Sequence, residues 1–284
     1  MRGRLRRFLP TSSVTVHSAD RAGSPLDVLS ARPAELDQDV TVPDIDLVKP
    51  PELTWWDWTV LLLHSAAEVE HALLVQYLYA AYSLAERGFA GPSVPADPEH
   101  LVRRWRRTIV GIAREEMGHL LTLQNLLRFI GGPLNFDRED FPFLSALYPF
   151  HFRLEPLSKD SLAKYVSAEM PAHPSQTPEE ILEVTQRATH AGGGAAVNRV
   201  GRLYAHLAVL FGDPARLPDD LFRPETADML QARPEDWQGS ETMIVRDVRS
   251  RGDALAAITS VGQQGEGPWI PEGAASPSHF DRFW

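Results

Sequence analysis

Residues 109–127 read IVGIAREEMGHLLTLQNLL, and they place a glutamate and a histidine on the apolar face of an expected helix. Apolar residues recur there at intervals of three and four, the spacing that keeps side chains on one helical face. The residues that share this face are Ile109, Ile112, Ala113, Glu116, Leu120, Leu123 and Leu127. His119 lies one turn from Glu116, so the two side chains can bind the same ion. An unpaired charge on an apolar face is costly, and a bound metal explains why Glu116 is there.

The helix expected over residues 54–87 carries a further acid on its apolar face. Glu70 shares that face with Leu63, Ala67, Leu74, Tyr77 and Ala81. The sequence therefore predicts that Glu70, Glu116 and His119 bind a metal. The alternative is a buried ion pair or a core histidine whose hydrogen bonds are satisfied.

Two nearby acids are expected to lie outside this set. Glu115 shares its face with Gly111, Gly118 and Thr122. We therefore expect Glu115 to point outward and Glu116 inward. Glu68 and His71 repeat the Glu-x-x-His spacing, on a face with His64 and Ser65 that we interpret as a partly solvated side or an outer layer.

The composition restricts the chemistry of such a site. The 284-residue chain contains no Cys, which excludes disulfides, thiolate zinc sites, iron–sulfur clusters and thiol nucleophiles together. A metal must then be held by oxygen and nitrogen, and Glu with His suits iron, with manganese as the alternative. The net charge of -10 argues against a nucleic-acid partner.

The two ends of the chain differ in character from its middle. The N-terminal residues are basic, but no apolar run of signal-peptide length follows, and no stretch approaches the roughly 18 apolar residues of a membrane span. We expect a soluble, cytoplasmic protein with no membrane partner. Residues 1–50 lack helical period and are expected to form an arm that is disordered or wraps the core. Residues 51–284 are expected to form one helical domain.

Further helices are expected after the second one ends at Gly131 and Gly132. Residues 133–157 carry many aromatic side chains and read as a crossover that forms a pocket lid or packs into the core. The helices expected beyond it are a short one that carries Glu169, residues 177–190 behind a capping box, residues 195–211, and residues 248–264. Glu169 faces inward, as does Glu266 if the last helix extends that far. No strand-like alternation is present, so the sequence predicts an all-α fold.

Inward Glu and Glu-x-x-His residues on four helices are the pattern of ferritin-like carboxylate bundles. The chain has this pattern in part, because residues 195–211 lack a carboxylate and the last helix lacks Glu-x-x-His. A wider set of motifs resembles a narrower family, the ferritin-like domain of the iminophenyl-pyruvate dimer synthase type found in violacein and rebeccamycin pathway enzymes. The matching stretches are EHA (70–72), EEMGHL (115–120), NLL (125–127), IGGP (130–133), YP (148–149), EMP (169–171), VGRLY (200–204), QGEG (264–267) and SHF (278–280). The resemblance implies a ferritin-like four-helix bundle with an N-terminal arm, a long aromatic crossover loop and a C-terminal tail.

The resemblance also implies an iron centre with ligands at the matching acidic and histidine positions. Those positions are Glu70, Glu116, His119, Glu169, Glu266 and His279. Glu266 and His279 would replace the missing Glu-x-x-His, with His279 returning from the tail. Arg202 stands where the family often has an acid, which leaves open whether one or two metals bind. The competing interpretations are a helix-end cap or ion pair for Glu169, a solvated helix terminus for Glu266 and an exposed tail for His279.

Tyr77 and Tyr204 are the candidate catalytic side chains. Each is expected to donate to a metal-bound carboxylate, and core packing is the alternative role. We expect Trp55, Trp56 and Trp58, together with loop 141–152, to shape a substrate pocket.

The leading functional hypothesis is a non-haem iron oxidative enzyme of specialised metabolism. It would use dioxygen as co-substrate and act on a small, amino-acid-derived molecule. The alternatives are an enzyme that couples imine or keto-acid units, a metal-storage bundle, and a structural bundle whose buried acids only set specificity. A homo-oligomer is compatible with the sequence.

Overall fold

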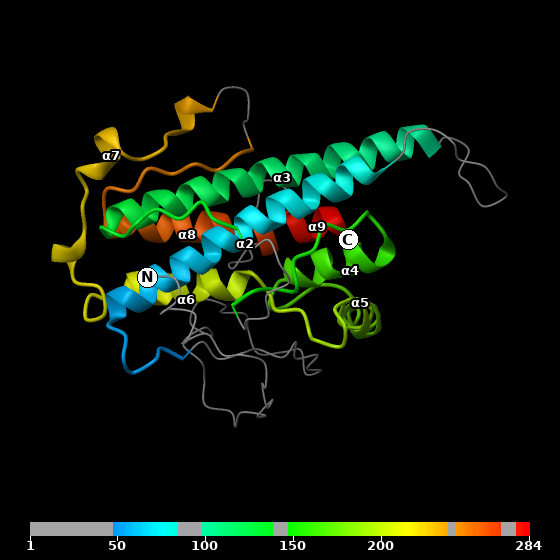
Figure 1. The fold of residues 1–284 in the computed structure, drawn as a ribbon, viewed down its shortest axis with the longest axis horizontal. Helices are drawn as coiled ribbons and strands as arrows, with labels where there is room; N and C mark the ends of the chain where they lie inside the picture. Colours follow the sequence, from blue (N-terminus) through cyan, green and yellow to red (C-terminus); the bar gives the residue numbers. More distant parts are fainter. Residues whose placement is uncertain (1–47, 85–97, 139–146, 238–241, 268–276) are drawn as a thin grey trace.

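The computed structural model describes residues 48–84, 98–138, 147–237, 242–267 and 277–284. Within these ranges the chain is helical and contains no strand, as the sequence predicts. Helices α2 (Trp55–Ser83) and α3 (Pro98–Phe129) form a long antiparallel pair (Figure 1). Helix α6 (Gly201–Gly212) packs on α2 and on α8 (Arg251–Glu266), and α8 also contacts α3. These four helices form the predicted bundle, whereas the expected arm lies almost wholly outside the described residues.

Hydrogen bonds tie the two ends of the α2–α3 pair together. The indole Nε1 of Trp56 donates to the carbonyl of Ile130 at 2.8 Å, where α2 begins and α3 has ended. At the other end, Nε of Arg106 donates to the carbonyl of Ala81 at 3.3 Å. The two helices therefore stay in register along their length, and acids on their facing sides are held at fixed positions.

Three helices close one end of the bundle. Helix α4 (Lys159–Ala168) packs on α5 (Pro178–Ala191), which begins at the predicted capping box of Thr177 and Glu180. Helix α9 (His279–Phe283) contacts α3, α4 and α8, where only a tail was expected. The segment between α6 and α8 contains the short helices η3 (Asp219–Leu221), α7 (Thr226–Met229) and η4 (Pro234–Asp236).

Two helices begin later than their sequence patterns predict. Helix α6 was expected from residue 195 but begins at Gly201, because the backbone N–H groups of Asn198 and Val200 donate to carbonyls of other segments. Helix α8 was expected from residue 248, but both backbone groups of Val248 bond to the side chain of Gln231. In both places a long-range hydrogen bond replaces the bond that a helix would have made.

Several aromatic side chains of the crossover pack into the core. Tyr148, Phe150 and Phe152 are buried, and Tyr148 donates its phenol proton to Glu68. The ring of Phe150 lies 5.1 Å from that of Phe152, centroid to centroid, in an edge-on arrangement. Phe141 and Phe143, which belong to the expected lid, lie outside the described residues. Tyr148, Phe150 and Phe152 therefore follow the packing alternative, whereas Phe136 is 51% exposed.

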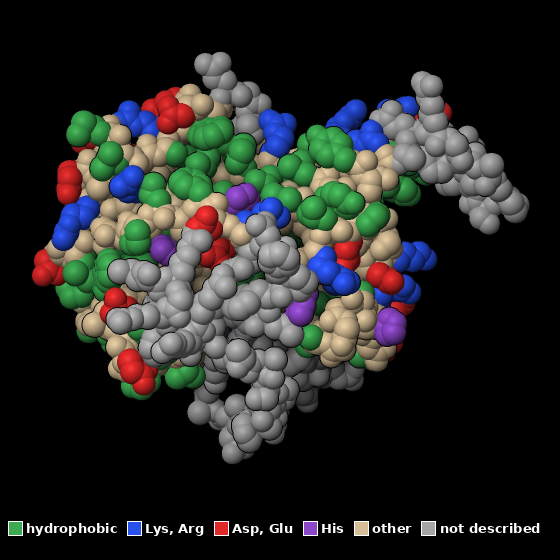
Figure 2. Space-filling model, in the orientation of Figure 1, with side chains coloured by type: hydrophobic (Ala, Val, Ile, Leu, Met, Phe, Trp, Pro, Cys, Tyr) green, Lys and Arg blue, Asp and Glu red, His purple; other side chains and the backbone are tan. Residues whose placement is uncertain are grey.

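The surface of the α2–α3 pair carries apolar as well as charged side chains (Figure 2). The exposed aromatic residues there include Tyr79, Tyr82 and Trp105. None of the helices in the described ranges has the length and apolar character needed to cross a bilayer.

An extended segment, residues 242–248, runs against the side of α3 at Gly118. Thr122 donates its hydroxyl proton to the carbonyl of Ile244 at 3.1 Å, and its oxygen accepts from the backbone N–H of Arg246. A Cβ built on Gly118 would lie 2.6 Å from Met243 Cγ and 2.7 Å from Ile244 O. Only glycine allows this approach, so α3 is covered on a second side.

We predict that Gly118→Ala destabilises the protein by about 1–3 kcal/mol, because the added methyl group must displace backbone of the packed segment. Thermal unfolding followed by circular dichroism measures the effect. Gly111→Ala on the same helix is the matched control, since among the described residues its Cβ would come no closer than 3.9 Å to an atom of another segment, Nη1 of Arg282. The control should gain about 0.5–1 kcal/mol from helix propensity. Equal melting temperatures for the two variants would contradict the close approach.

Candidate metal centre

Buried acids and histidines meet in two groups inside the bundle. The first group is Glu70 from α2 with Glu116 and His119 from α3. The second is Glu116 with Glu169, which ends α4, and His279, the first residue of α9. In each group one ligand atom per residue lies within 4.8 Å of the others, and every side chain is buried. Glu116 belongs to both groups.

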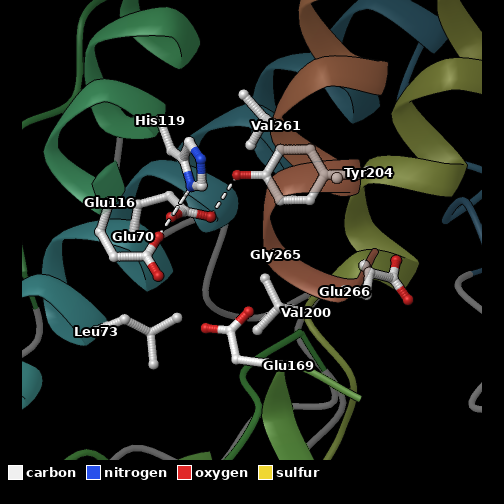
Figure 3. Close-up of a pocket in the computed structure, with 12 residues that line it drawn as sticks. Glu70, Leu73, Glu116, His119, Glu169, Val200, Tyr204, Val261, Gly265 and Glu266 are labelled. Atoms are coloured by element: carbon white, nitrogen blue, oxygen red, sulfur yellow. Dashed lines mark hydrogen bonds and ion pairs between the residues drawn. The ribbon is translucent and has the colours of Figure 1, made fainter. Parts of the chain in front are cut away.

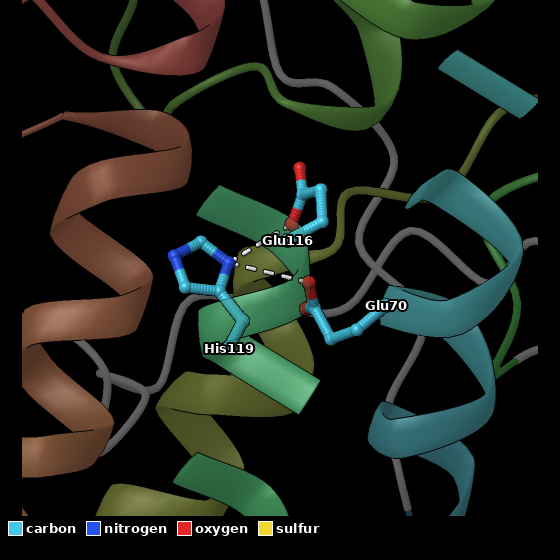
Figure 4. Close-up of side chains that lie close together, drawn as sticks. All are labelled: Glu70, Glu116 and His119. Atoms are coloured by element: carbon cyan, nitrogen blue, oxygen red, sulfur yellow. Dashed lines mark hydrogen bonds and ion pairs between the residues drawn. The ribbon is translucent and has the colours of Figure 1, made fainter. Parts of the chain in front are cut away.

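The first group is held by His119, whose ring faces two acids (Figure 4). Its Nδ1 lies 3.2 Å from Glu70 Oε2 and 2.9 Å from Glu116 Oε2. Its other nitrogen, Nε2, lies 2.9 Å from Oε1 of Gln264 on α8. The imidazole therefore spans the space between α3 and α8 with one nitrogen directed at the acids.

The second group uses the opposite oxygen of Glu116. Its Oε1 lies 2.9 Å from Nδ1 of His279, which in turn lies 3.8 Å from Glu169 Oε2. The rings of His119 and His279 stack with their centroids 5.4 Å apart. Glu116 thus directs one oxygen to each group, the arrangement of a carboxylate that can bridge two ions.

Two tyrosines occupy the remaining oxygens of the outer acids. Tyr204 donates to Glu70 Oε1, and Tyr77 donates to Glu169 Oε1 at 2.7 Å. Burial and the nearby carboxylates raise the pKa of both phenols well above the usual value, so they remain protonated donors. Each outer acid is left with one oxygen, Oε2, directed into its group.

The charges of the cluster are balanced by protons when no metal is bound. Burial, helped by the charge of Glu116, raises the pKa of Glu70 to about 8. Burial opposes the charged form of His119, but its bonds to the two acids prevail and raise its pKa to about 10. The acids likewise raise the pKa of His279 well above its usual value, and the His279 charge holds the pKa of Glu116 low despite burial. These opposite charges keep the cluster neutral enough to be buried.

The donor set fits a metal ion. Glu116 Oε1 and His279 Nδ1 are 2.9 Å apart, yet both are buried and neither aligns in a hydrogen bond among the described residues. Buried polar atoms without such a partner are uncommon, and a water molecule or an ion is one way to satisfy them. A cation between carboxylate oxygens and imidazole nitrogens would satisfy both atoms, and this oxygen and nitrogen set suits iron or manganese.

A small cavity adjoins the first group (Figure 3). Its volume is ≈ 10 Å³, room for about one water molecule or ion. The lining residues are Glu70, Leu73, Glu116, His119, Glu169, Val200, Gly201, Tyr204, Val261, Gly262, Gly265 and Glu266. None of the three tryptophans expected at a pocket is among them. Trp58 is instead buried in the core, and Trp55 and Trp56 pack against it.

Glu266 lies in the cavity wall but in neither metal group. Its carboxylate points away from Glu70 and Glu116 (Figure 3), and its Oε2 lies 3.3 Å from Arg199 Nη1. A Cβ on Gly201 would fall 1.4 Å from Glu266 Oε1, so glycine at the start of α6 leaves the room that this carboxylate fills. A role for Glu266 as a ligand stays a prediction.

The expectation that Glu115 points outward is wrong. The residue is 2% exposed, and its Oε2 lies 2.9 Å from His279 Nε2. Arg282 of α9 donates to both of its oxygens. Burial alone would raise the pKa of Glu115, but bonds from His279 and Arg282 outweigh burial and lower it. Glu115 is therefore a charged acid that binds α9, and the signal for that helix was the Ser278-x-x-Asp281 capping box, which the sequence reading missed.

The second Glu-x-x-His pair lies outside both groups. Glu68 accepts from Asn135 at 3.0 Å and from Tyr148, while His71 Nδ1 lies 3.0 Å from the carbonyl of Phe136. All three partners belong to the crossover. Arg202 is buried and is likewise absent from the two groups.

The chain is similar to a protein family, to two curated proteins and to a solved structure. A family model described as ferritin-like matches residues 63–284. The chain is 29% identical to dichlorochromopyrrolate synthase of Lentzea aerocolonigenes, over 93% of its own length and 28% of the relative's. It is 30% identical to 2-imino-3-(indol-3-yl)propanoate dimerase of Chromobacterium violaceum, over 78% of its own length and 22% of the relative's. A solved ferritin-like protein from Caulobacter vibrioides has a TM-score of 0.48 and 17% identity, covering 79% of this chain and 70% of that one.

We predict that Glu116→Ala abolishes binding at both metal positions, because each position uses one of its oxygens. Glu70→Ala and Glu169→Ala should each remove one position only. Elemental analysis after loading with Fe²⁺ gives the metal content per chain. The control is Glu68→Ala with His71→Ala, which should keep the wild-type content. Loss of metal in that control with retention in Glu116→Ala would assign the site to the other Glu-x-x-His pair.

Metal binding should strengthen as the pH rises. At pH 7 the metal-free protein holds protons on Glu70 and His119, whose pKa values are about 8 and about 10, and an ion must displace them. Both pKa values are raised on folding, so protonation stabilises the metal-free fold at low pH, and this contribution is lost between pH 4.5 and about 8 for Glu70 and between pH 6.5 and about 10 for His119. Titration with Mn²⁺ by calorimetry between about pH 6 and 9 measures affinity and proton release. A pH-independent affinity would show that the ion binds elsewhere.

Proposed function

Because the chain belongs to the ferritin-like family, whose model matches residues 63–284, we propose that it is a metal-dependent enzyme of specialised metabolism. The observation that carries this proposal is the shared acid Glu116, which has one oxygen in each of two buried groups of carboxylates and imidazole. Because the two groups share Glu116, the centre could hold one iron ion or two. The relatives support a biosynthetic role, since both bear the names of biosynthetic enzymes.

The residues of the centre have two roles: the glutamates and histidines would bind the ions, and the tyrosines donate hydrogen bonds to the glutamates. Glu70, Glu116 and His119 would hold one ion, and Glu116, Glu169 and His279 a second. Iron bound there would supply a redox centre for dioxygen or a Lewis acid for an imine. Tyr204 lines the cavity and donates a hydrogen bond from its phenol to Glu70 Oε1, so it holds this acid in place beside a bound molecule. Tyr77 holds Glu169 in the same way from outside the cavity.

For the substrate we propose a small imino or keto acid derived from an aromatic amino acid. The name of the Chromobacterium relative contains such a molecule, 2-imino-3-(indol-3-yl)propanoate. The chain spans less than a third of the length of either relative, and this proposal is supported by the name of the Chromobacterium relative. The cavity of ≈ 10 Å³ is too small for an indole ring, and a substrate must displace part of its wall. We place the substrate beside Val200, Gly201 and Gly265, whose side chains are small, and the Glu266 carboxylate that fills the space beside Gly201 would have to move.

Coupling of two imine or keto-acid units is the second candidate. It is favoured by the word dimerase in the name of the same relative. In that reaction the ion would act as a Lewis acid, and the Glu and Tyr residues would keep the roles given above. Storage of iron fits less well, because storage cages are built from subunits close to a minimal bundle, and this chain adds α4, α5, α9 and the segment between α6 and α8.

We expect the Fe²⁺-loaded protein to consume oxygen faster when indole-3-pyruvate and ammonium, which form the imine in solution, are present. An oxygen electrode and mass spectrometry of the products measure the reaction. Glu116→Ala should lower the uptake to the background rate, whereas Glu68→Gln, outside both groups, should leave it unchanged.

The outcomes separate the candidate functions. A coupled product that forms equally without oxygen would favour Lewis-acid coupling over oxidation. Oxidation and accumulation of many iron atoms per chain without any organic substrate would favour storage and contradict the enzymatic proposal.

A further inference from the structure

Each histidine of the centre directs Nδ1 at the proposed ligand acids and has a hydrogen-bond partner on its other nitrogen, Nε2. For His119 this partner is Gln264, whose Oε1 lies 2.9 Å from Nε2. The amide nitrogen of Gln264 donates to the carbonyl of Thr242 at 2.8 Å, which fixes the amide with its oxygen toward the ring. An amide oxygen only accepts, so Nε2 of His119 carries the proton and Nδ1 faces the acids.

For His279 the partner is a carboxylate. Glu115 Oε2 lies 2.9 Å from Nε2, and both oxygens of Glu115 accept from the guanidinium of Arg282. A carboxylate held by arginine accepts only, so Nε2 of His279 also carries its proton. Its Nδ1 is left facing Glu116 Oε1 at 2.9 Å.

Glu115 and Gln264 differ in charge and in the helix that each one contacts or belongs to. A hydrogen bond to a carboxylate is roughly twice as strong as one to a neutral amide, and it makes the imidazole a stronger electron donor. Glu115 also binds Arg282, one turn from His279 on α9, so it fixes the short helix that carries the ligand. Gln264 lies within α8, a bundle helix with its own core contacts.

We propose that Glu115 and Gln264 are positioning residues that turn Nδ1 of each histidine toward the acids, and that the charge of Glu115 makes His279 the stronger donor. This inference rests on the proposed metal centre. It assigns a task to two side chains that are not themselves ligands, the buried Glu115 and the half-buried Gln264. It also makes the two metal positions chemically different, although each is built from an acid, the shared Glu116 and an imidazole.

The test is titration of the metal-free full chain with Co²⁺, an absorbing and paramagnetic probe, in wild type and two near-isosteric variants. Glu115→Gln should raise the dissociation constant of one Co²⁺ by about 10–100-fold, the usual effect of losing such a partner, and leave the other unchanged. Gln264→Met should weaken the other Co²⁺ instead. Glu68→Gln, a half-buried acid outside both groups, is the control and should change neither.

Proton NMR of the Co²⁺-loaded protein gives a readout that a general loss of stability would not produce. Two exchangeable, strongly shifted signals are expected from the Nε2 protons of the ligating histidines, and both should vanish in D₂O. Glu115→Gln should move or broaden only one signal, and Gln264→Met only the other.

Three outcomes are decisive. A wild-type protein that binds no Co²⁺ or Fe²⁺ would overturn the metal centre itself. A wild type that binds two ions, with both variants unchanged in affinity and spectrum, would overturn the positioning roles alone. Equal weakening of both ions by either variant would show that these residues act through the fold and not on one histidine.

Discussion

The burial of several carboxylates within one apolar bundle is the constraint on which the rest of the structure depends. Like charges in a low-dielectric core repel strongly, and each must be protonated, paired or bound to a cation. Glu116 meets this requirement between two imidazoles, with His119 on one side and His279 on the other. Removing one partner of such a buried pair typically costs about 3–5 kcal/mol, because the remaining charge stays buried. The positions of α3, α8 and α9 follow from keeping these rings around one acid.

The cluster consists of two similar halves supplied by different parts of the chain. Each half contains an outer acid, a tyrosine that bonds to that acid and a histidine, and both share Glu116. The bundle helices supply the first half through α2, α3 and α6, whereas α4 and α9 add much of the second. A set of paired long helices can therefore build one position, and the second depends on segments that close the end of the bundle.

The sequence correctly predicted which side chains point into the bundle wherever a helix buries a single apolar face. Glu70, Glu116 and His119 lie on stripes at intervals of three and four, and the structure brings these three residues together. Glu115 was misplaced because periodicity assumes a single buried face, whereas α3 is also covered by residues 242–248 and by α9. The start of α6 was misplaced for a related reason, since the bonds that straighten residues 195–200 go to distant carbonyls. Contacts made by loops and short helices leave no period in the sequence, and the partners of Glu115 and Glu266 could not be found from it.

The separation along the chain between the groups of the cluster gives the centre a second physical role. Glu70 and His119 are 49 residues apart, and His279 reaches Glu116 on α3 from the C-terminal end of the chain. An ion held by such residues links distant parts of the folded chain, and it is released on unfolding because the unfolded chain holds no preformed site. Bound metal would stabilise the folded chain according to its concentration relative to its dissociation constant. The centre would then hold the tertiary structure together as well as carry the chemistry, and the supply of metal would set the stability of the folded protein.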